Sequence, residues 1–307
     1  MRAGPDLPES MNRGEQPSPT YRGRFAPSPT GPLHFGSLVA ALGSFLDARA
    51  HRGLWFVRID DLDRARNVAG ATTSILRDLE RLGLHWDQEV HYQMPRRGVY
   101  QDALESLRTR GLAYPCACSR KQVGNRPYPG TCRNGVAAGK NPRSLRLHTG
   151  NARMEIHDRI QGPFRQVLSD TVGDFVVLRG DSIPAYHLAT ALDDAALSIT
   201  HVVRGNDLLD STPRQVLLQQ ELELSTPNYA HLPVATNSKG QKLSKQTHAE
   251  PVSEHNPTRL LWAALDFLGQ QPPNEWLDAS PQALLGEAIR NWDLARIPAT
   301  SGTAPEV

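Results

Sequence analysis

The sequence predicts an α/β fold organised around a parallel sheet. Two short apolar runs, LWFVRI at 54–59 and ITHVVRG at 199–205, have the length and composition of buried strands. Both runs lead directly into polar residues, and the carboxyl ends of strands are where open α/β sheets contact their ligands. A segment with helical periodicity follows each run, and strands that alternate with helices favour parallel pairing.

The first predicted element is a proline-rich loop, from Tyr21 to Ser37, that leads into a helix. Beyond Ser37, apolar residues recur at helical spacing, namely Leu38, Ala41, Leu42, Phe45 and Leu46. A helix start presents unpaired N–H groups and a partial positive charge, which suits a phosphate. Gly36 lets a flat group approach the backbone, and His34 is placed to hydrogen-bond a phosphate oxygen. Taken alone, the loop fits a rigid connector with a core histidine equally well.

Further helices and strands are expected along the rest of the chain. Amphipathic helices should cover 72–84 and 99–112 and stop near Gly83 and Gly111. Alternating apolar runs within 144–180 predict a small antiparallel sheet. The remaining expected elements are a helix at 185–197, a helix at 212–222 with Pro213 at its start, a strand at 231–237, helices between 257 and 292, and a frayed end over the last ten residues.

Composition and charge narrow the class of protein. The chain has 307 residues and a formal net charge of +2, so a nucleic-acid partner would have to meet a local basic face. No run of about 18 apolar residues occurs, and the polar first 20 residues do not resemble a secretory signal. We therefore expect a cytoplasmic protein with no membrane partner.

Three cysteines lie close together in the sequence. Cys116-x-Cys118 is followed by Tyr128 and Cys132, and three thiolates with one phenolate can complete a tetrahedral structural zinc site. Without an export signal the cluster favours a metal or free thiols over disulfides. Free cysteines in a loop remain the alternative interpretation.

A second candidate phosphate contact is KLSK at 242–245, in which two lysines flank a hydroxyl. By itself it could be a solvated run of charge. Together with RFAPSPTGPLHFGS at 24–37, however, it resembles the two signature motifs of the class I aminoacyl-tRNA synthetases. RFAPSPTG narrows the resemblance to the glutamyl/glutaminyl branch, and RIDDLD at 58–63 is similar to the next sequence block of that branch.

Two features narrow the resemblance further. Only about 60 residues follow Gln246, whereas ordinary glutamyl-tRNA synthetases carry a further helical domain that reads the anticodon. The pattern C-x-C…Y-x3-C in so short a chain resembles the glutamyl-Q tRNA(Asp) synthetase family. That family activates glutamate and attaches it to queuosine, the modified base at the wobble position of tRNA(Asp).

The resemblance implies roles for individual residues. It assigns glutamate to Arg24, Phe25, Ala26, Pro27, Ser28, Asp60, Tyr186 and Arg204. It assigns ATP to His34, Gly36, Ser37, Lys242, Ser244 and Lys245, with His34 and Lys245 as the catalytic pair. Planar arginine forks suit carboxylates, and Asp60 would balance the glutamate ammonium. The family often has Glu where Asp60 stands, so the shorter side chain departs from its pattern.

The implied architecture is a Rossmann-type catalytic domain with an inserted α+β subdomain that carries one structural zinc, and a short helical C-terminal part. The expected divisions are a tail at 1–20, the first catalytic half at 21–112, the insertion at 113–184, the second half at 185–250, helices at 251–297 and a tail at 298–307. The implied partners are L-glutamate, ATP with Mg²⁺, and queuosine-containing tRNA(Asp). A monomer is expected. Four arginines of the insertion are candidate RNA contacts, namely Arg120, Arg126, Arg133 and Arg143, although an ordinary solvated surface explains them at least as well.

Three other functions remain open. A truncated glutamyl-tRNA synthetase would charge the 3′ end of tRNA(Glu), although the anticodon-reading domain is missing. A nucleotidylyltransferase acting on a small acid leaves RFAPSPTG and the cysteine pattern unexplained. A non-enzymatic RNA-binding relative should have lost His34 or the lysine loop, and both are present.

Overall fold

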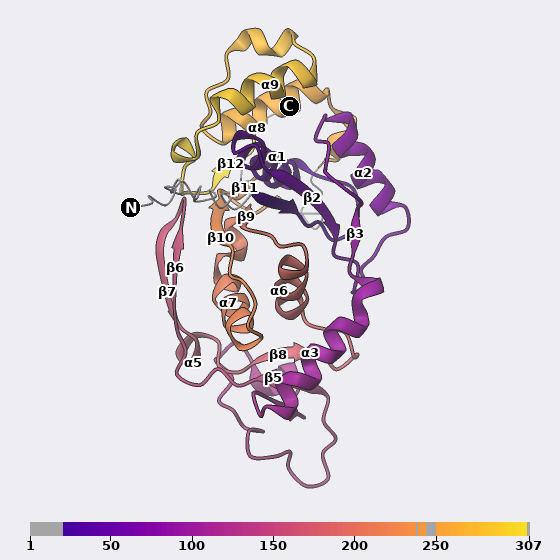
Figure 1. Cartoon of the computed structure of the whole chain (residues 1–307), viewed down its shortest axis with the longest axis vertical. Coiled ribbons are helices and arrows are strands. Elements are labelled where there is room, and N and C mark those ends of the chain that lie inside the picture. The colour runs from indigo at the N-terminus through magenta and orange to yellow at the C-terminus, as the bar shows by residue number, and fades with distance from the viewer. Residues whose placement is uncertain (1–20, 238, 244–249, 306–307) are drawn as a thin grey trace, which may run out of the picture.

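The computed structural model describes residues 21–237, 239–243 and 250–305. Figure 1 shows an elongated molecule with a parallel sheet near its middle, the C-terminal helices at one end and the inserted strands β5 and β8 at the other. Within these residues no helix is both long and apolar enough to cross a membrane.

The central sheet is parallel, as predicted. Phe25 of β1 pairs with Val57 of β2, and Leu232 of β10 pairs with Gly205 of β9. The two sets meet where Thr200 N donates to the Arg22 carbonyl at 3.0 Å, which sets β9 beside β1. The strands of this sheet are β1 (Arg22–Phe25), β2 (Leu54–Ile59), β3 (His91–Tyr92), β9 (His201–Gly205) and β10 (Asn228–Leu232).

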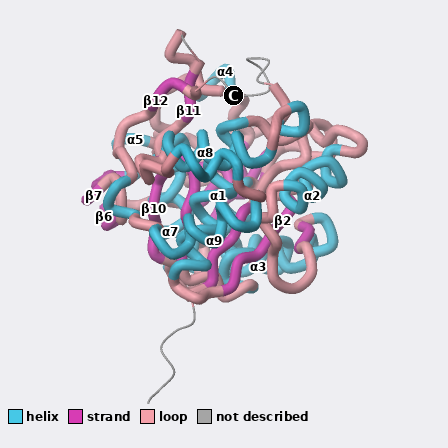
Figure 2. The backbone as a smooth tube through the Cα atoms, turned by 90° about the horizontal axis from the view of Figure 1, so that it is seen from above, coloured by secondary structure: helices cyan, strands magenta, loops and turns pink. Residues whose placement is uncertain are grey.

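Successive residues of β2 supply two hydrophobic cores. Trp55, Val57 and Ile59 belong to the core beneath one set of helices, whereas Phe56 belongs to the core on the opposite face. This alternation follows from the two-residue period of a strand and requires helices on both faces. In Figure 2, α1, α8 and α9 lie together over the strands. The first face is covered by α1 (Phe35–Ala50), α2 (Ala71–Arg81), α8 (Pro257–Phe267) and α9 (Pro281–Asn291), and the second by α3 (Arg97–Thr109), α6 (Tyr186–Ala196) and α7 (Thr212–Glu221).

The insertion forms two antiparallel units rather than one small sheet. The strands β4, β5 and β8 form one sheet, and β6 pairs with β7 in a separate ribbon. The ribbon lies along β10, at the left of Figure 1. The elements here are β4 (Ala113–Cys116), α4 (Arg120–Val123), β5 (Ser144–Leu147), β6 (Arg153–Asp158), β7 (Gly162–Val167), α5 (Leu168–Thr171) and β8 (Phe175–Leu178).

Three sequence-based expectations require correction. Residues 22–25 were expected to be loop but form β1. The strand expected at 231–237 ends at Leu232, because Pro233 cannot donate to the ladder, and a separate β11 follows at Ala235–Thr236. The last ten residues include β12, Gly302–Thr303, which pairs with β11 instead of fraying. Short 3-10 helices complete the described chain at Met94–Arg96, Asn206–Ser211, Val252–Glu254, Asn274–Asp278 and Leu294–Arg296.

Candidate active site

A cavity of about 740 Å³ opens at the carboxyl ends of β1, β9 and β10. The strand order changes direction between β1 and β9, and such a switch point is where open α/β sheets bind ligands. Of the eight residues assigned to glutamate, the cavity is lined by Arg24, Phe25, Ala26, Pro27, Ser28, Tyr186 and Arg204. Of those assigned to ATP, it is lined by His34, Gly36, Ser37 and Lys242.

The start of α1 forms one wall of the cavity. His34 caps this helix, since its Nδ1 accepts from Ser37 N at 3.3 Å. A Cβ at Gly36 would lie 3.3 Å from the His34 ring, so a larger residue would crowd that ring, and 3.8 Å from the Leu243 carbonyl. No acidic residue stands in the first turn of the helix. The wall is therefore electropositive and suited to phosphate.

Arg24 at the end of β1 is 3% exposed and already has a carboxylate partner. Asp194 of α6 accepts from its Nε at 3.1 Å and from its Nη2 at 3.3 Å. The same carboxylate accepts from Arg58 Nη1 at 2.6 Å. Burial alone would raise the pKa of Asp194, but the two arginines hold it below its usual value. The charge of Arg24 is thus largely compensated before any substrate binds.

Arg204 at the end of β9 is equally buried, at 4% exposure, but its contacts are different. Its Nε donates to His231 Nε2 at 3.1 Å, and its Nη2 donates at 2.8 Å to both Thr212 Oγ1 and Gln215 Oε1. Among the described residues, no carboxylate forms an ion pair with it. In the described part of the chain, the one hydrogen bond of the Nη1 group is to the Tyr186 hydroxyl, at 3.5 Å, and Arg204 lines the cavity. Arg204 therefore offers an uncompensated charge to an anionic ligand.

Asp60 is the one predicted glutamate contact that does not line the cavity. It is 9% exposed, and its two oxygens accept from Arg58 at 2.7 and 3.4 Å. Burial raises its pKa, although Arg58 opposes the shift. Asp60 thus lies behind the cavity wall as a partner of Arg58, whereas Tyr186 is 39% exposed at the mouth.

The lysine loop is only partly described. Lys242 lines the cavity and pairs with Asp207 at 2.6 Å, on the side of the cavity formed by the end of β9. Ser244 and Lys245 lie outside the described residues. The loop therefore reaches the cavity through at least one of its predicted phosphate contacts.

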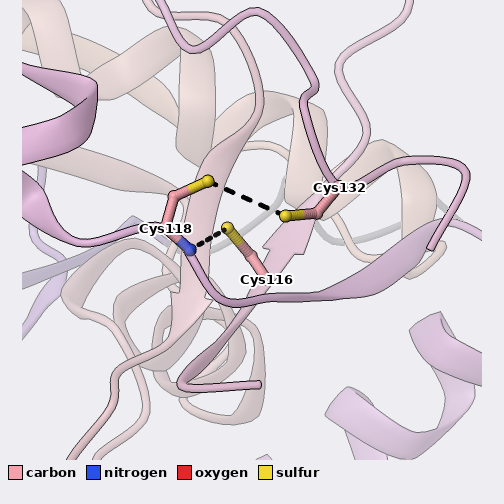
Figure 3. Close-up of side chains that lie close together, drawn as sticks. All are labelled: Cys116, Cys118 and Cys132. Atoms are coloured by element: carbon pink, nitrogen blue, oxygen red, sulfur yellow. Dashed lines mark hydrogen bonds between the residues drawn. The ribbon is translucent and has the colours of Figure 1, made fainter. Parts of the chain in front are cut away.

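The three cysteines converge in the insertion. Figure 3 shows their sulfur atoms pointing toward one another, with Cys118 Sγ and Cys132 Sγ 3.7 Å apart. The Tyr128 hydroxyl lies 3.3 Å from Cys116 Sγ and 3.5 Å from Cys118 Sγ. Tetrahedral Zn–S bonds of about 2.3 Å place two sulfurs about 3.8 Å apart, so these four side chains fit a zinc ion. No disulfide joins them.

Arg146 lies directly against this cluster. Its Nε donates to Cys116 Sγ at 3.3 Å, and its guanidinium stacks over the Tyr128 ring at 3.9 Å from the centroid. Burial alone would raise the pKa of Cys116, but hydrogen bonds from Tyr128, the Cys118 N–H and Arg146 lower it to about 7. A lowered thiol pKa favours the thiolate that a metal requires.

Of the four arginines considered for RNA contact, one is committed elsewhere. Arg133 donates to both oxygens of Asp174, at 2.6 and 2.8 Å, and so holds the insertion together. Arg120, Arg126 and Arg143 are exposed.

The sequence analysis did not identify the buried residues that surround Arg24 and Arg204. Asp193 and Asp194 interrupt an apolar helix, and Arg58 interrupts an apolar strand, so charges within otherwise buried elements were the available signal. Asp193 accepts hydrogen bonds from Gln93 Nε2, Arg96 Nε and the Tyr100 hydroxyl. His231 gave no comparable signal, because its partners come from distant parts of the chain.

Comparison with known proteins places this geometry in a family. The family model for the catalytic domain of class I tRNA synthetases (E and Q) matches residues 20–260. A glutamyl-Q tRNA(Asp) synthetase of Aromatoleum aromaticum is 52% identical over 289 residues, covering 92% of this chain and 91% of that protein. A protein of the same name from Thiobacillus denitrificans is 51% identical, covering 90% of this chain and 94% of its own.

A solved structure supports the same relationship. The glutamate tRNA ligase of Elizabethkingia meningosepticum, in complex with its amino acid, superimposes with a TM-score of 0.78 at 25% identity. The match covers 93% of this chain and 67% of that one. The class I synthetase catalytic fold is thus present in this chain.

Proposed function

Because the chain belongs to the glutamyl-Q tRNA(Asp) synthetase family of class I synthetases, we propose that it activates L-glutamate with ATP and transfers it to queuosine in tRNA(Asp). The observation that carries the proposal is that one cavity joins a carboxylate site to a phosphate site. Arg24 and Arg204 stand at the strand ends, and the start of α1 stands beside them. An amino acid and a nucleotide need both sites within reach of each other.

In the first step, an α-carboxylate oxygen of glutamate attacks the α-phosphorus of ATP. The new O–P bond forms as the bond to pyrophosphate breaks, giving glutamyl-adenylate. His34, the N–H groups of α1 and the lysine loop stabilise the charge that develops on the phosphates. We assign the same task to Lys245 and a supporting one to Ser244 and Lys242. Mg²⁺ bound with ATP would neutralise phosphate charge.

In the second step, a hydroxyl oxygen of queuosine attacks the activated carbonyl. An ester forms, AMP leaves, and the hydroxyl proton is released to solvent. No protein nucleophile is needed, so positioning and electrostatics supply most of the rate. Arg24 and Arg204 hold glutamate, and the chain from Phe25 to Ser28 shapes the pocket around it. Asp60 pairs with Arg58 behind the cavity wall, and its role toward the glutamate ammonium stays a prediction.

We also propose that the insertion is a zinc-bearing subdomain. Cys116, Cys118, Tyr128 and Cys132 would hold one Zn²⁺, which would crosslink a part of the chain that has a small core of its own. The role is structural, because all four positions are filled by protein groups. The expectation of a monomer stays a prediction.

Transfer of labelled glutamate to two tRNA pools tests the function. One pool comes from normal cells and the other from cells unable to make queuosine. Label confined to the queuosine-containing pool, and mapped to the anticodon by nuclease digestion, is the expected result.

Other outcomes would identify a different function. Equal labelling of both pools at the 3′ end would make the chain a truncated glutamyl-tRNA synthetase. If neither pool is labelled but glutamate-dependent ATP–pyrophosphate exchange is intact, the protein activates glutamate, and queuosine in tRNA is not its acceptor.

A further inference from the structure

A buried Asp–His pair stands directly behind Arg204. Asp158 Oδ2 and His231 Nδ1 are 2.6 Å apart, and both side chains have no exposed surface. Neither residue lines the cavity, so neither contacts a ligand bound there. Arg204 does line it, and its Nε faces His231 Nε2 at 3.1 Å.

The proton positions in this chain of contacts follow from chemistry. A guanidinium can only donate, so His231 Nε2 must present its lone pair to Arg204. The ring proton then lies on Nδ1 and is donated to Asp158. Burial and the nearby Arg204 lower the pKa of His231, although Asp158 opposes them, so the imidazole is neutral.

We propose that Asp158 and His231 are positioning residues that set the orientation of Arg204 toward the substrate carboxylate. Asp158 selects the tautomer, and that tautomer supplies the acceptor that holds Arg204 Nε. With Nε and Nη2 both engaged, the Nη1 group is left directed at the cavity. The inference rests on the proposed function, because it assumes that Arg204 binds glutamate.

The location of Asp158 ties the inserted ribbon to the active site. Asp158 ends β6, and its Oδ1 accepts from the backbone N–H groups of Ile160 at 3.0 Å, Gln161 at 2.8 Å and His231 at 3.1 Å. The carboxylate therefore closes the turn of the ribbon with one oxygen and directs the histidine with the other. Because each oxygen has its own partners, a mutation can change the contact with His231 and keep the hydrogen bonds of the turn.

Asp158→Asn is the decisive substitution. The new amide oxygen can keep the three backbone hydrogen bonds, whereas the new NH₂ group can only donate to His231 Nδ1. The ring proton must then move to Nε2, where it faces the Arg204 Nε–H donor. The fold is preserved while the acceptor that holds Arg204 is lost.

We expect the KM for glutamate in ATP–pyrophosphate exchange to rise by about tenfold or more, the scale of one lost charge-assisted hydrogen bond. The KM for ATP should stay near the wild-type value. Loss of the buried carboxylate should lower the melting temperature, but the variant should remain folded at the assay temperature. Glu155→Gln is the matched control, because it removes a carboxylate from the exposed face of the same strand. That variant should keep the wild-type KM for glutamate.

A spectroscopic measurement on the wild type does not depend on any variant folding. In ¹⁵N-histidine spectra, with the His231 signal assigned by its loss in His231→Gln, Nδ1 should be protonated and Nε2 should not. A protonated Nε2 would overturn the inference. So would an unchanged KM for glutamate in Asp158→Asn, or a parallel rise in the KM values for glutamate and ATP. If the wild type shows no glutamate-dependent exchange, the proposed function fails, and the inference fails with it.

Discussion

At the scale of single residues, Arg146 matters to the cysteine cluster through charge. Three thiolates and one phenolate carry four negative charges against the two positive charges of Zn²⁺, so the filled site would be an anion. Arg146 is 8% exposed and touches both a sulfur and the phenol ring of this site. Its positive charge would offset part of the negative charge of that site and so lower the free-energy cost of burying it.

Replacing Arg146 with Met should therefore weaken zinc binding by about 10- to 100-fold, the usual effect of losing a group that hydrogen-bonds a ligand. The measurement is zinc affinity by competition with a chromophoric chelator. Arg143→Met removes an exposed arginine from the same insertion and should leave the affinity unchanged. Equal affinities in the wild type and the Arg146 variant would show that the site needs no counter-charge.

Asp174, also at the scale of single residues, makes a contribution to the free energy of unfolding that depends on pH. Burial alone would raise its pKa, but hydrogen bonds from Arg133, Tyr114 and Thr149 outweigh burial and hold the pKa at about 2. A carboxyl whose pKa is depressed on folding stabilises the protein above its unfolded pKa and loses that effect as the pH falls. The contribution is on the order of 2 kcal/mol.

Asp174→Asn should consequently lower the free energy of unfolding at pH 7 and converge with the wild type between about pH 4 and pH 2. Urea denaturation at a series of pH values measures both curves. A constant difference between the two proteins down to pH 2 would show that ionisation of Asp174 does not contribute.

At the scale of elements, two glycines differ in the space that the fold leaves for a side chain. A Cβ at Gly53, just before β2, would lie 2.4 Å from the Tyr21 carbonyl oxygen, so β1 and β2 can align only without it. A Cβ at Gly98, in α3, would meet nothing within 4 Å.

Gly53→Ala should therefore destabilise the fold by about 1–3 kcal/mol, since the strands must shift to admit the methyl group. Gly98→Ala should be neutral or stabilising by up to about 1 kcal/mol, because alanine loses less entropy in a helix. Chemical denaturation of the two variants gives the comparison. Equal effects would mean that the approach of Tyr21 to Gly53 does not limit the packing.

At the scale of the whole molecule, buried charges join elements that are far apart in the chain. Asp194 of α6 accepts from Arg24 of β1 and Arg58 of β2, which lie 170 and 136 residues away in sequence. All three side chains are nearly inaccessible. The network therefore joins α6 to β1 and β2, although these elements are far apart in the chain.

Asp194→Asn should cost about 3–5 kcal/mol, because two buried guanidinium groups lose their shared carboxylate. Asp170→Asn removes the same charge from an exposed position and should change stability by less than about 0.5 kcal/mol. Urea unfolding of both variants is the measurement. A small effect at Asp194 would mean that water or other groups compensate the arginines.

The sequence alone predicted the parallel sheet, most helices, the loop that starts α1 and the cysteine cluster. Each of these is encoded over short distances, by periodicity or by the spacing of a motif. The strand β1 was missed because its four residues, RGRF, contain two arginines, and only burial between β2 and β9 makes them a strand. The strand β12 was missed because its pairing partner lies 67 residues earlier in the chain.

Tertiary contacts alone decide how Arg24 and Arg204 differ in the charge that they offer to a ligand. In the sequence, Arg24 and Arg204 are equivalent cations, each assigned to a glutamate carboxylate. In the folded protein, Asp194 compensates Arg24, whereas neutral acceptors from β10 and α7 hold Arg204 and leave its charge unpaired. Electrostatic interactions act through space and grow as water is excluded, so the charge available to a ligand depends on which distant side chains the fold brings within hydrogen-bond distance.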